Sequence, residues 1–178
     1  SFSSLVGSLQ ANSVDMVISG MTATEERKQI VDFSDVYCTS SVGCVTKVDS
    51  DINSFENLQN QIVCCSQGTN YEMMIEDIPG TTLKTYQGQA AVGTAVAEAT
   101  DGVAAGLTSI NGAKKLATTM LDADGNPMLK YFALEGARAD EYCMAFPKGS
   151  KLTAIFNKGI QALKDSGKLE ELIQYWLY

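Results

Sequence analysis

The residues from Ser19 to Arg27 combine groups that could bind a small anion. This stretch, SGMTATEER, follows a short apolar run and carries two threonine hydroxyls, an expected helix start and an arginine. A helix N-terminus offers unpaired N–H groups and a partial positive charge, and a guanidinium matches a carboxylate with two parallel hydrogen bonds. The stretch is therefore a candidate carboxylate clamp. The alternative is that Thr24 only caps a helix and Arg27 is solvated.

A second turn of the same kind lies at residues 67–70, Gln-Gly-Thr-Asn. Gly68 allows a ligand to approach the backbone closely. Thr69 or Asn70 can either cap the following helix or donate a hydrogen bond to an anion. A plain helix cap is the competing interpretation, but two such turns favour binding more than either one alone.

The elements that must position these turns follow from hydrophobic periodicity. Strands are expected at 16–18, 42–47, 62–65, 83–86, 102–107 and 142–146. Helices are expected at 2–9, 25–30, 70–76, 89–98, 114–121, 150–163 and 169–176. The pair Thr22 and Glu25 fits a capping box for the second helix. The alternation predicts an α/β fold with mainly parallel strands, in which ligands bind at the carboxyl ends of strands.

Composition excludes several classes of function. The net charge is −8, which argues against nucleic acid as a partner. The chain has no histidine, which excludes Ser-His-Asp and Cys-His catalysis and argues against a zinc enzyme. No apolar run approaches the ~20 residues of a membrane span. Residues 1–10 lack the pattern of a signal peptide, so an exported form is expected to have lost its targeting segment.

The five cysteines are expected to be buried free thiols, because the count is odd and no Cys-x-x-Cys spacing occurs. Cys64 and Cys65 are neighbours in an expected strand and should point to opposite faces. The loop at 122–126 lacks the glycine and the glutamate that a calcium loop requires at positions 127 and 133, which predicts a surface turn. No metal site and no cofactor is predicted.

The run from Leu9 to Tyr37 resembles the signature of polar amino-acid-binding proteins of ABC importers. The shared features are a Gly- and Thr-bearing turn after a strand, then TEER at 24–27, then FSDVY at 33–37. SQGTNYE at 66–72 and the stretch 146–176 resemble later parts of the same family, so the resemblance covers nearly the whole chain. It implies the two-lobed fold of type II periplasmic binding proteins, whose two hinge strands allow closure on a ligand.

The resemblance also implies roles for particular residues. Arg27 would hold the ligand α-carboxylate, Thr22 would contact the ligand through its hydroxyl, and Gly20 through its backbone. Lobe 1 is expected at 1–42 and 147–178, and lobe 2 with both hinge strands at 43–146. Thr69 and Asn70 would add contacts to the carboxylate from lobe 2, at a turn where Gly68 is also a ligand-binding residue.

Two departures from the family pattern affect these expectations. The family usually forms a strand, a helix and another strand before the segment where this chain starts, so lobe 1 would be incomplete at its N-terminus and would expose a sheet edge. In addition, Gly106 takes the place of the aspartate that binds the ligand ammonium in the family. Either Glu135 or Asp140 supplies the acid instead, or the ligand is not a simple α-amino acid.

The function implied is that of a solute-binding component of an ABC transporter, without catalytic residues. It would capture an amino acid or related small carboxylate and deliver it to a membrane permease. The location would be the periplasm or the cell surface, with or without a lipid anchor. Three alternatives stay open: a ligand-sensing domain of the same fold, a truncated chain completed by a second chain, and an enzyme, because some dehydratases share this fold.

Overall fold

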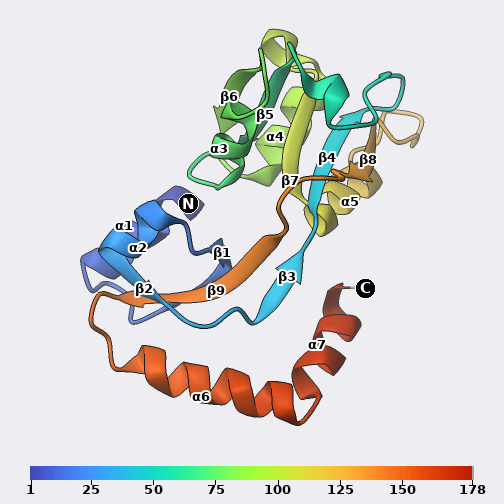
Figure 1. The fold of residues 1–178 in the computed structure, drawn as a ribbon. Helices are drawn as coiled ribbons and strands as arrows, with labels where there is room; N and C mark the ends of the chain where they lie inside the picture. The colour runs from blue at the N-terminus through green and yellow to red at the C-terminus, as the bar shows by residue number, and fades with distance from the viewer. Residues whose placement is uncertain (178) are drawn as a thin grey trace. The chain divides into compact units, whose positions relative to one another are not determined.

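The computed structural model describes residues 1–177, which divide into two compact units. The central unit contains residues 1–3 and 41–139, and the terminal unit contains residues 4–40 and those from Asp140 onward. Tyr178, the last residue of the expected lobe 1, lies outside the described residues. Figure 1 shows the helices and strands of each unit.

The central unit is built on a five-stranded sheet in the order β6-β5-β7-β4-β8. The strands, in chain order, are β4 (Val42–Lys47), β5 (Ile62–Ser66), β6 (Thr82–Tyr86), β7 (Ala105–Ser109) and β8 (Leu129–Ala133). The helices are α3 (Tyr71–Glu76), α4 (Gln89–Ala97) and α5 (Ile110–Thr119), with short 3-10 helices η2 (Glu56–Leu58) and η3 (Thr100–Gly102). β5 pairs in parallel with β6 and β7. α3 and α4 provide the crossovers that parallel pairing requires.

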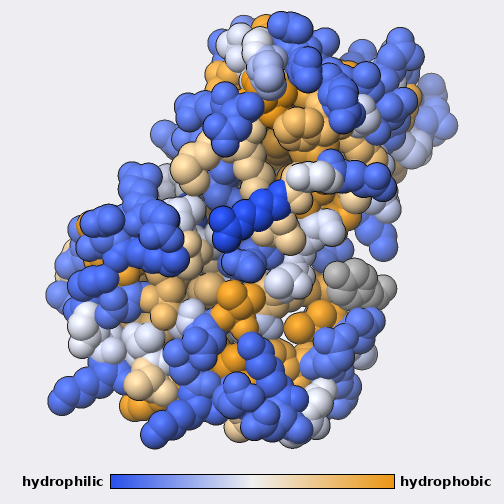
Figure 2. All heavy atoms as spheres, viewed as in Figure 1, coloured by the Kyte–Doolittle hydropathy of each residue, from blue (hydrophilic) through white to orange (hydrophobic). Residues whose placement is uncertain are grey.

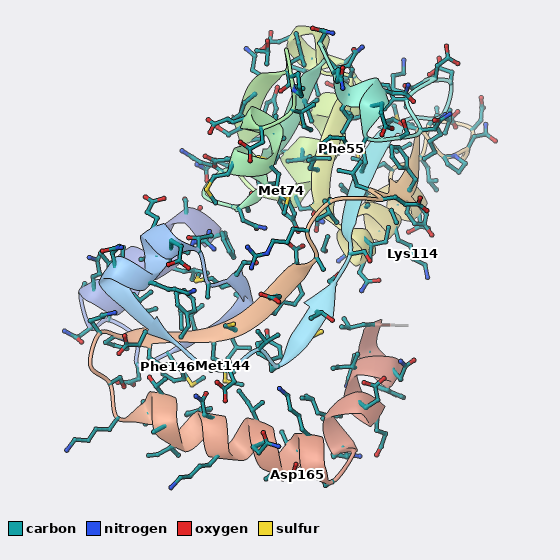
Figure 3. All side chains as sticks on the ribbon, in the orientation of Figure 1. Phe55, Met74, Lys114, Met144, Phe146 and Asp165 are labelled. Carbon is teal, nitrogen blue, oxygen red and sulfur yellow. The ribbon has the colours of Figure 1, made fainter. Side chains whose placement is uncertain are left out.

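Both faces of this sheet are covered by apolar side chains. Cys65 belongs to the cluster that also contains Ile75 of α3, with Phe55 and Met74 packed against it (Figure 3). Cys64 belongs to the other cluster, together with side chains of α4 and α5. The expectation that the two neighbouring cysteines point to opposite faces is therefore confirmed. Burial on these faces raises the pKa of each of the two thiols to about 12, so both stay protonated at neutral pH.

The terminal unit is organised around one long strand, β9, which pairs with β1 on one side and with β2 and β3 on the other. Its strands are β1 (Val17–Thr22), β2 (Val31–Phe33), β3 (Cys38–Ser40) and β9 (Asp140–Pro147). Its helices are α1 (Leu5–Gln10), α2 (Glu25–Ile30), α6 (Leu152–Asp165) and α7 (Lys168–Leu177), and the 3-10 helix η1 (Phe2–Ser4) precedes α1. Phe146 of β9 packs on Phe156 of α6 with ring centroids 5.4 Å apart, and Met144 lies two residues away on the same strand (Figure 3).

The expectation of mainly parallel strands is wrong. Among residues 1–177, five of the seven strand pairings are antiparallel, and only the β5–β6 and β5–β7 pairs are parallel. The reason lies in the connections. β1, β2 and β3 follow one another over short links, and each pairs with β9, which enters from more than a hundred residues later and runs in the opposite direction.

The second expected lobe boundary, between 146 and 147, also differs from the structure. The division falls between Ala139 and Asp140 because β9 is hydrogen-bonded along its length to strands of the terminal unit. The first division, between Ser40 and Ser41, lies two residues before the expected one. The stretch 142–146 is therefore a sheet strand of the terminal unit rather than part of lobe 2.

Close packing of α5 on β4 generates a stability prediction. A methyl group at Gly43 would lie 2.7 Å from the Cβ of Ala113 and 2.8 Å from the Cα of Ile110. We expect Gly43→Ala to lower the free energy of unfolding by about 1–3 kcal/mol, because the backbone of α5 must shift. Urea unfolding monitored by circular dichroism measures this change.

The matched control for this variant is Gly159→Ala in α6, where the added methyl would meet no atom within 4 Å. Alanine restricts the unfolded chain and favours the helix, so this variant should gain about 0.5–1 kcal/mol. A Gly43→Ala protein as stable as the parent would contradict the packing of α5 on β4.

Candidate functional site

The terminal unit holds a group of candidate ligand-binding residues at the junction of β1 and α2. Thr22 is the last residue of β1, and Thr24 is the N-cap of α2, where its Oγ1 accepts a 3.3 Å hydrogen bond from the backbone N–H of Arg27. The expected capping box between Thr22 and Glu25 is therefore wrong. Thr22 is still in extended strand backbone, so the cap falls to the threonine directly before the helix.

Arg27 is fixed beside the end of β1. Its Nη1 donates a 2.8 Å hydrogen bond to the backbone carbonyl of Thr22, and the side chain is partly buried. The alternative of a simply solvated arginine is therefore wrong, although Thr24 does cap the helix. Glu25 of the first helical turn pairs with Lys28 at 2.7 Å. The guanidinium is therefore a positive group held at the backbone carbonyl of Thr22.

The Thr22 hydroxyl is buried and has no hydrogen-bond partner among residues 1–177. An unsatisfied buried hydroxyl costs about 1–3 kcal/mol, so such a group in a folded protein calls for an explanation. A ligand oxygen that accepts from this hydroxyl and from the Arg27 guanidinium would satisfy it. This orphaned hydroxyl is the strongest sign of a binding function in the terminal unit.

Gly20 lies on β1 with a positive φ of 59° and an exposed backbone. A methyl group there would sit 3.5 Å from the ring of Tyr142. Burial raises the pKa of Tyr37, and hydrogen bonding with the Gly20 backbone opposes that rise. Neither Tyr142 nor Tyr37 was expected as a site residue from the sequence. The only available signal was that aromatic residues flank the strands expected near the site.

The candidate contacts of the central unit lie at the turn after β5. Thr69 donates from its hydroxyl to the Ser66 carbonyl at 2.7 Å. Asn70 occupies the N-cap of α3 without a side-chain capping bond. Gly68 has a φ of +80°, and its N–H donates to a carboxylate oxygen of Glu72. The backbone of Ser3 lies where a Gly68 side chain would point, 2.8 Å from the methyl position, so glycine is required here.

Gly106 occupies a buried position within β7. A methyl group there would lie 2.8 Å from Val92 and 3.2 Å from Val45 and Val96, all in the apolar cluster under α4. A carboxylate at 106 would therefore point into the core rather than toward a ligand. The polar residues at the carboxyl end of β7 are Thr108 and Ser109, neither of which was expected at the site. Of the two acids expected as substitutes, Glu135 is exposed and Asp140 is buried in the terminal unit.

The structure thus groups Gly20, Thr22 and Arg27 in one unit and residues 68–70 in the other. Within residues 1–177 no three His, Cys, Asp or Glu side chains are placed to hold a metal ion. No helix in the same range is long and apolar enough to cross a bilayer. All five cysteines are free and buried, as expected.

A pair of threonine substitutions tests this geometry in the protein without ligand. Thr22→Val replaces an unsatisfied buried hydroxyl with a methyl, so the free energy of unfolding should stay level or rise by about 1 kcal/mol. Thr24→Val removes the cap of α2 and should lower it by about 1 kcal/mol. Chemical denaturation of both variants in parallel measures the difference. If Thr22→Val is the more damaging of the two, its hydroxyl has a structural partner and is not a ligand group.

Comparison with known proteins gives one consistent family. The arginine-binding extracellular protein ArtP of Bacillus subtilis is 34% identical over 183 residues, covering 98% of this chain and 68% of ArtP. The glutamine-binding protein GlnH of the same organism is 31% identical, covering 95% of this chain and 60% of GlnH. The chain therefore spans roughly two thirds of these relatives.

Solved structures agree with these relatives. The arginine-, lysine-, histidine-binding protein ArtJ of Geobacillus stearothermophilus superposes with a TM-score of 0.83 at 27% identity, over 97% of this chain and 74% of ArtJ. A family model matches residues 1–178. The neighbours are type II periplasmic binding proteins, which confirms the fold class expected from the sequence. The chain belongs to the bacterial extracellular solute-binding proteins, family 3.

Proposed function

We propose that this chain binds an amino acid by its α-carboxylate and passes it to the permease of an ABC transporter. The observation that carries the proposal is the buried, unpartnered hydroxyl of Thr22, a residue whose backbone carbonyl holds the guanidinium of Arg27. A carboxylate would accept hydrogen bonds from both groups at once. Because Arg27 already donates one hydrogen bond to the Thr22 carbonyl, its fork is oriented before a ligand arrives.

The turn at 68–70 is proposed to contact the same ligand. Its support is the family resemblance together with its position at the carboxyl end of a parallel strand, where ligands bind in open α/β sheets. The two units would then act as two lobes. Ligand that contacts both would favour the closed state by its extra affinity for that state. The protein would work outside the cytoplasm, in the periplasm or at the cell surface, with or without a lipid anchor.

A thermal-shift screen of the common amino acids tests the proposal. A ligand present at 100 times its Kd stabilises the folded protein by about 2.7 kcal/mol. We expect at least one amino acid to raise Tm in the parent protein and to lose that effect in Arg27→Ala.

The matched control is Arg138→Ala, which removes the same charge from an exposed position and should keep the shift. If no amino acid stabilises a chain that melts cooperatively, the proposal fails. A ligand that is recovered chemically altered after incubation would point instead to the enzyme alternative.

The terminal unit also presents surfaces that suggest a further polypeptide segment beside it. Among residues 1–177, β1 pairs only with β9, so its other edge is open. Ile18 on this strand is 55% exposed, and on α7 Tyr175 and Trp176 are 77% and 74% exposed. Figure 2 shows hydrophobic residues that interrupt the hydrophilic surface of the terminal unit. We propose that a strand-bearing segment, from a second chain or a longer form of this one, completes the unit.

An open strand edge and exposed apolar side chains favour self-association. We expect the chain alone to sediment as concentration-dependent oligomers and to enhance the fluorescence of the apolar dye ANS. Ile18→Lys should reduce both effects, because a charge at an edge strand opposes pairing. Thr94→Lys, at an exposed position of helix α4 in the central unit, serves as the control. A monodisperse monomer without dye binding would show that this surface needs no cover.

A further inference from the structure

The three parallel strands of the central unit end at one edge in a cluster of uncharged polar side chains. The pairings Ser66↔Tyr86 and Cys65↔Leu107 place the ends of β5, β6 and β7 level with one another. The residues there are Ser-Gln-Gly-Thr-Asn at 66–70, Tyr-Gln-Gly-Gln at 86–89 and Thr-Ser-Ile at 108–110, with no charged side chain among them. This is the edge at which an open α/β sheet binds its ligand.

Two of these side chains form a positioned pair. The Nε2 of Gln89 donates a 2.8 Å hydrogen bond to the Oγ1 of Thr108, whose side chain is only 9% exposed. Gly112 of α5 lies against this pair, since a methyl there would fall 1.8 Å from Gln89 Nε2 and 2.8 Å from Thr108 Oγ1. The amide therefore occupies the space that a side chain at 112 would fill. Because Gln89 Nε2 donates to Thr108 Oγ1, the amide oxygen of Gln89 remains available as an acceptor, and the Thr108 hydroxyl can still donate its hydrogen.

Most of the remaining groups at this edge carry no formal charge, and the start of α4 adds a partial positive charge. Gln67 and Gln87 hydrogen-bond to each other, and Ser1 donates to the Oε1 of Gln87 at 3.1 Å. α4 starts directly beside the Gln89–Thr108 pair, and its N-cap Gly88 supplies no side-chain cap, so its first N–H groups face this edge. The nearby carboxylate of Glu72 accepts from the Gly68 N–H.

We infer that Gln89 and Thr108 recognise an uncharged amide on the ligand's side chain. This inference rests on the proposed function and specifies its ligand class: an amide-bearing neutral amino acid rather than a cationic one. The amide NH2 of such a ligand would donate to Gln89 Oε1, and its carbonyl would accept from the Thr108 hydroxyl or the N–H groups that begin α4. A guanidinium or ammonium buried here would meet the positive end of α4, and the nearby Glu72 carboxylate is already engaged by the Gly68 N–H.

Calorimetric titration with L-glutamine and L-arginine tests the inference on the whole protein. The parent is expected to bind glutamine more tightly than arginine. Gln89→Glu places a carboxylate at the same position and should move the affinity ratio toward arginine by at least about tenfold, since a close charge pair at a binding site is worth several times the thermal energy. Gln59→Glu, at an exposed position of the same unit, should leave the ratio unchanged.

The possible outcomes separate this inference from the proposal on which it rests. A parent protein that prefers arginine, or a Gln89→Glu ratio equal to that of Gln59→Glu, overturns the assignment of Gln89 while amino-acid binding stands. Binding of neither amino acid nor any other to a cooperatively folded parent overturns the proposed function itself. If Gln89→Glu does not fold, the preference of the parent for one of the two amino acids still decides.

Discussion

β9 is the strand on which the terminal unit depends, since β1, β2 and β3 all hydrogen-bond to it and, within residues 1–177, not to one another. The backbone N–H groups of Ser34 and Tyr37, between β2 and β3, also donate to β9 carbonyls. Thr22 lies opposite Tyr142 in this ladder. The position of the Thr22 hydroxyl, and of the Arg27 side chain tied to the Thr22 carbonyl, is therefore set by a strand more than a hundred residues away in the chain.

In each unit, polar groups of the candidate site are held by protein contacts that use only some of their hydrogen-bonding atoms. In the terminal unit, one nitrogen of Arg27 is used to fix the side chain, while the neighbouring Thr22 hydroxyl stays unpaired. In the central unit, the Gln89 amide nitrogen donates to Thr108 Oγ1. This bond leaves the Gln89 amide oxygen as an acceptor and the Thr108 hydroxyl hydrogen as a donor. Groups fixed in this way lose little freedom when a ligand binds, which is how preorganisation increases affinity.

Much of the fold was predictable from the sequence because the relevant signals are local. The helix at 25–30 and the strand at 42–47 match the expected ranges, and the helix at 71–76 begins one residue later than expected, since each depends on nearby caps and apolar spacing. β2, β3 and β8 were not expected. β2 and β3 are only three residues long, too short for a periodic pattern, and form because a distant strand pairs with them. The prediction of mainly parallel strands was wrong for the same reason, because strand direction is set by long-range pairing.

For the site, local chemistry led to Arg27, Thr22 and the turn at 68–70, but it could not show which atoms stay unpaired. The misplaced capping box came from sequence spacing, and the choice of Gly106 came from the family resemblance. The structure shows that a side chain at Gly106 would enter the apolar core, and that Thr108, two residues later on the same face, lies next to the last strand residue, Ser109. Gln89 is brought to Thr108 by the crossover through α4, a contact across nineteen residues that no local motif marks.

The most direct test of the central claim is a crystal structure grown with the amino acid that stabilises the protein most. The account predicts the ligand α-carboxylate within hydrogen-bond distance of both the Arg27 guanidinium and the Thr22 Oγ1, at about 2.7–3.0 Å. An amino acid bound with its carboxylate elsewhere, and with the Thr22 hydroxyl still unpaired, would contradict it.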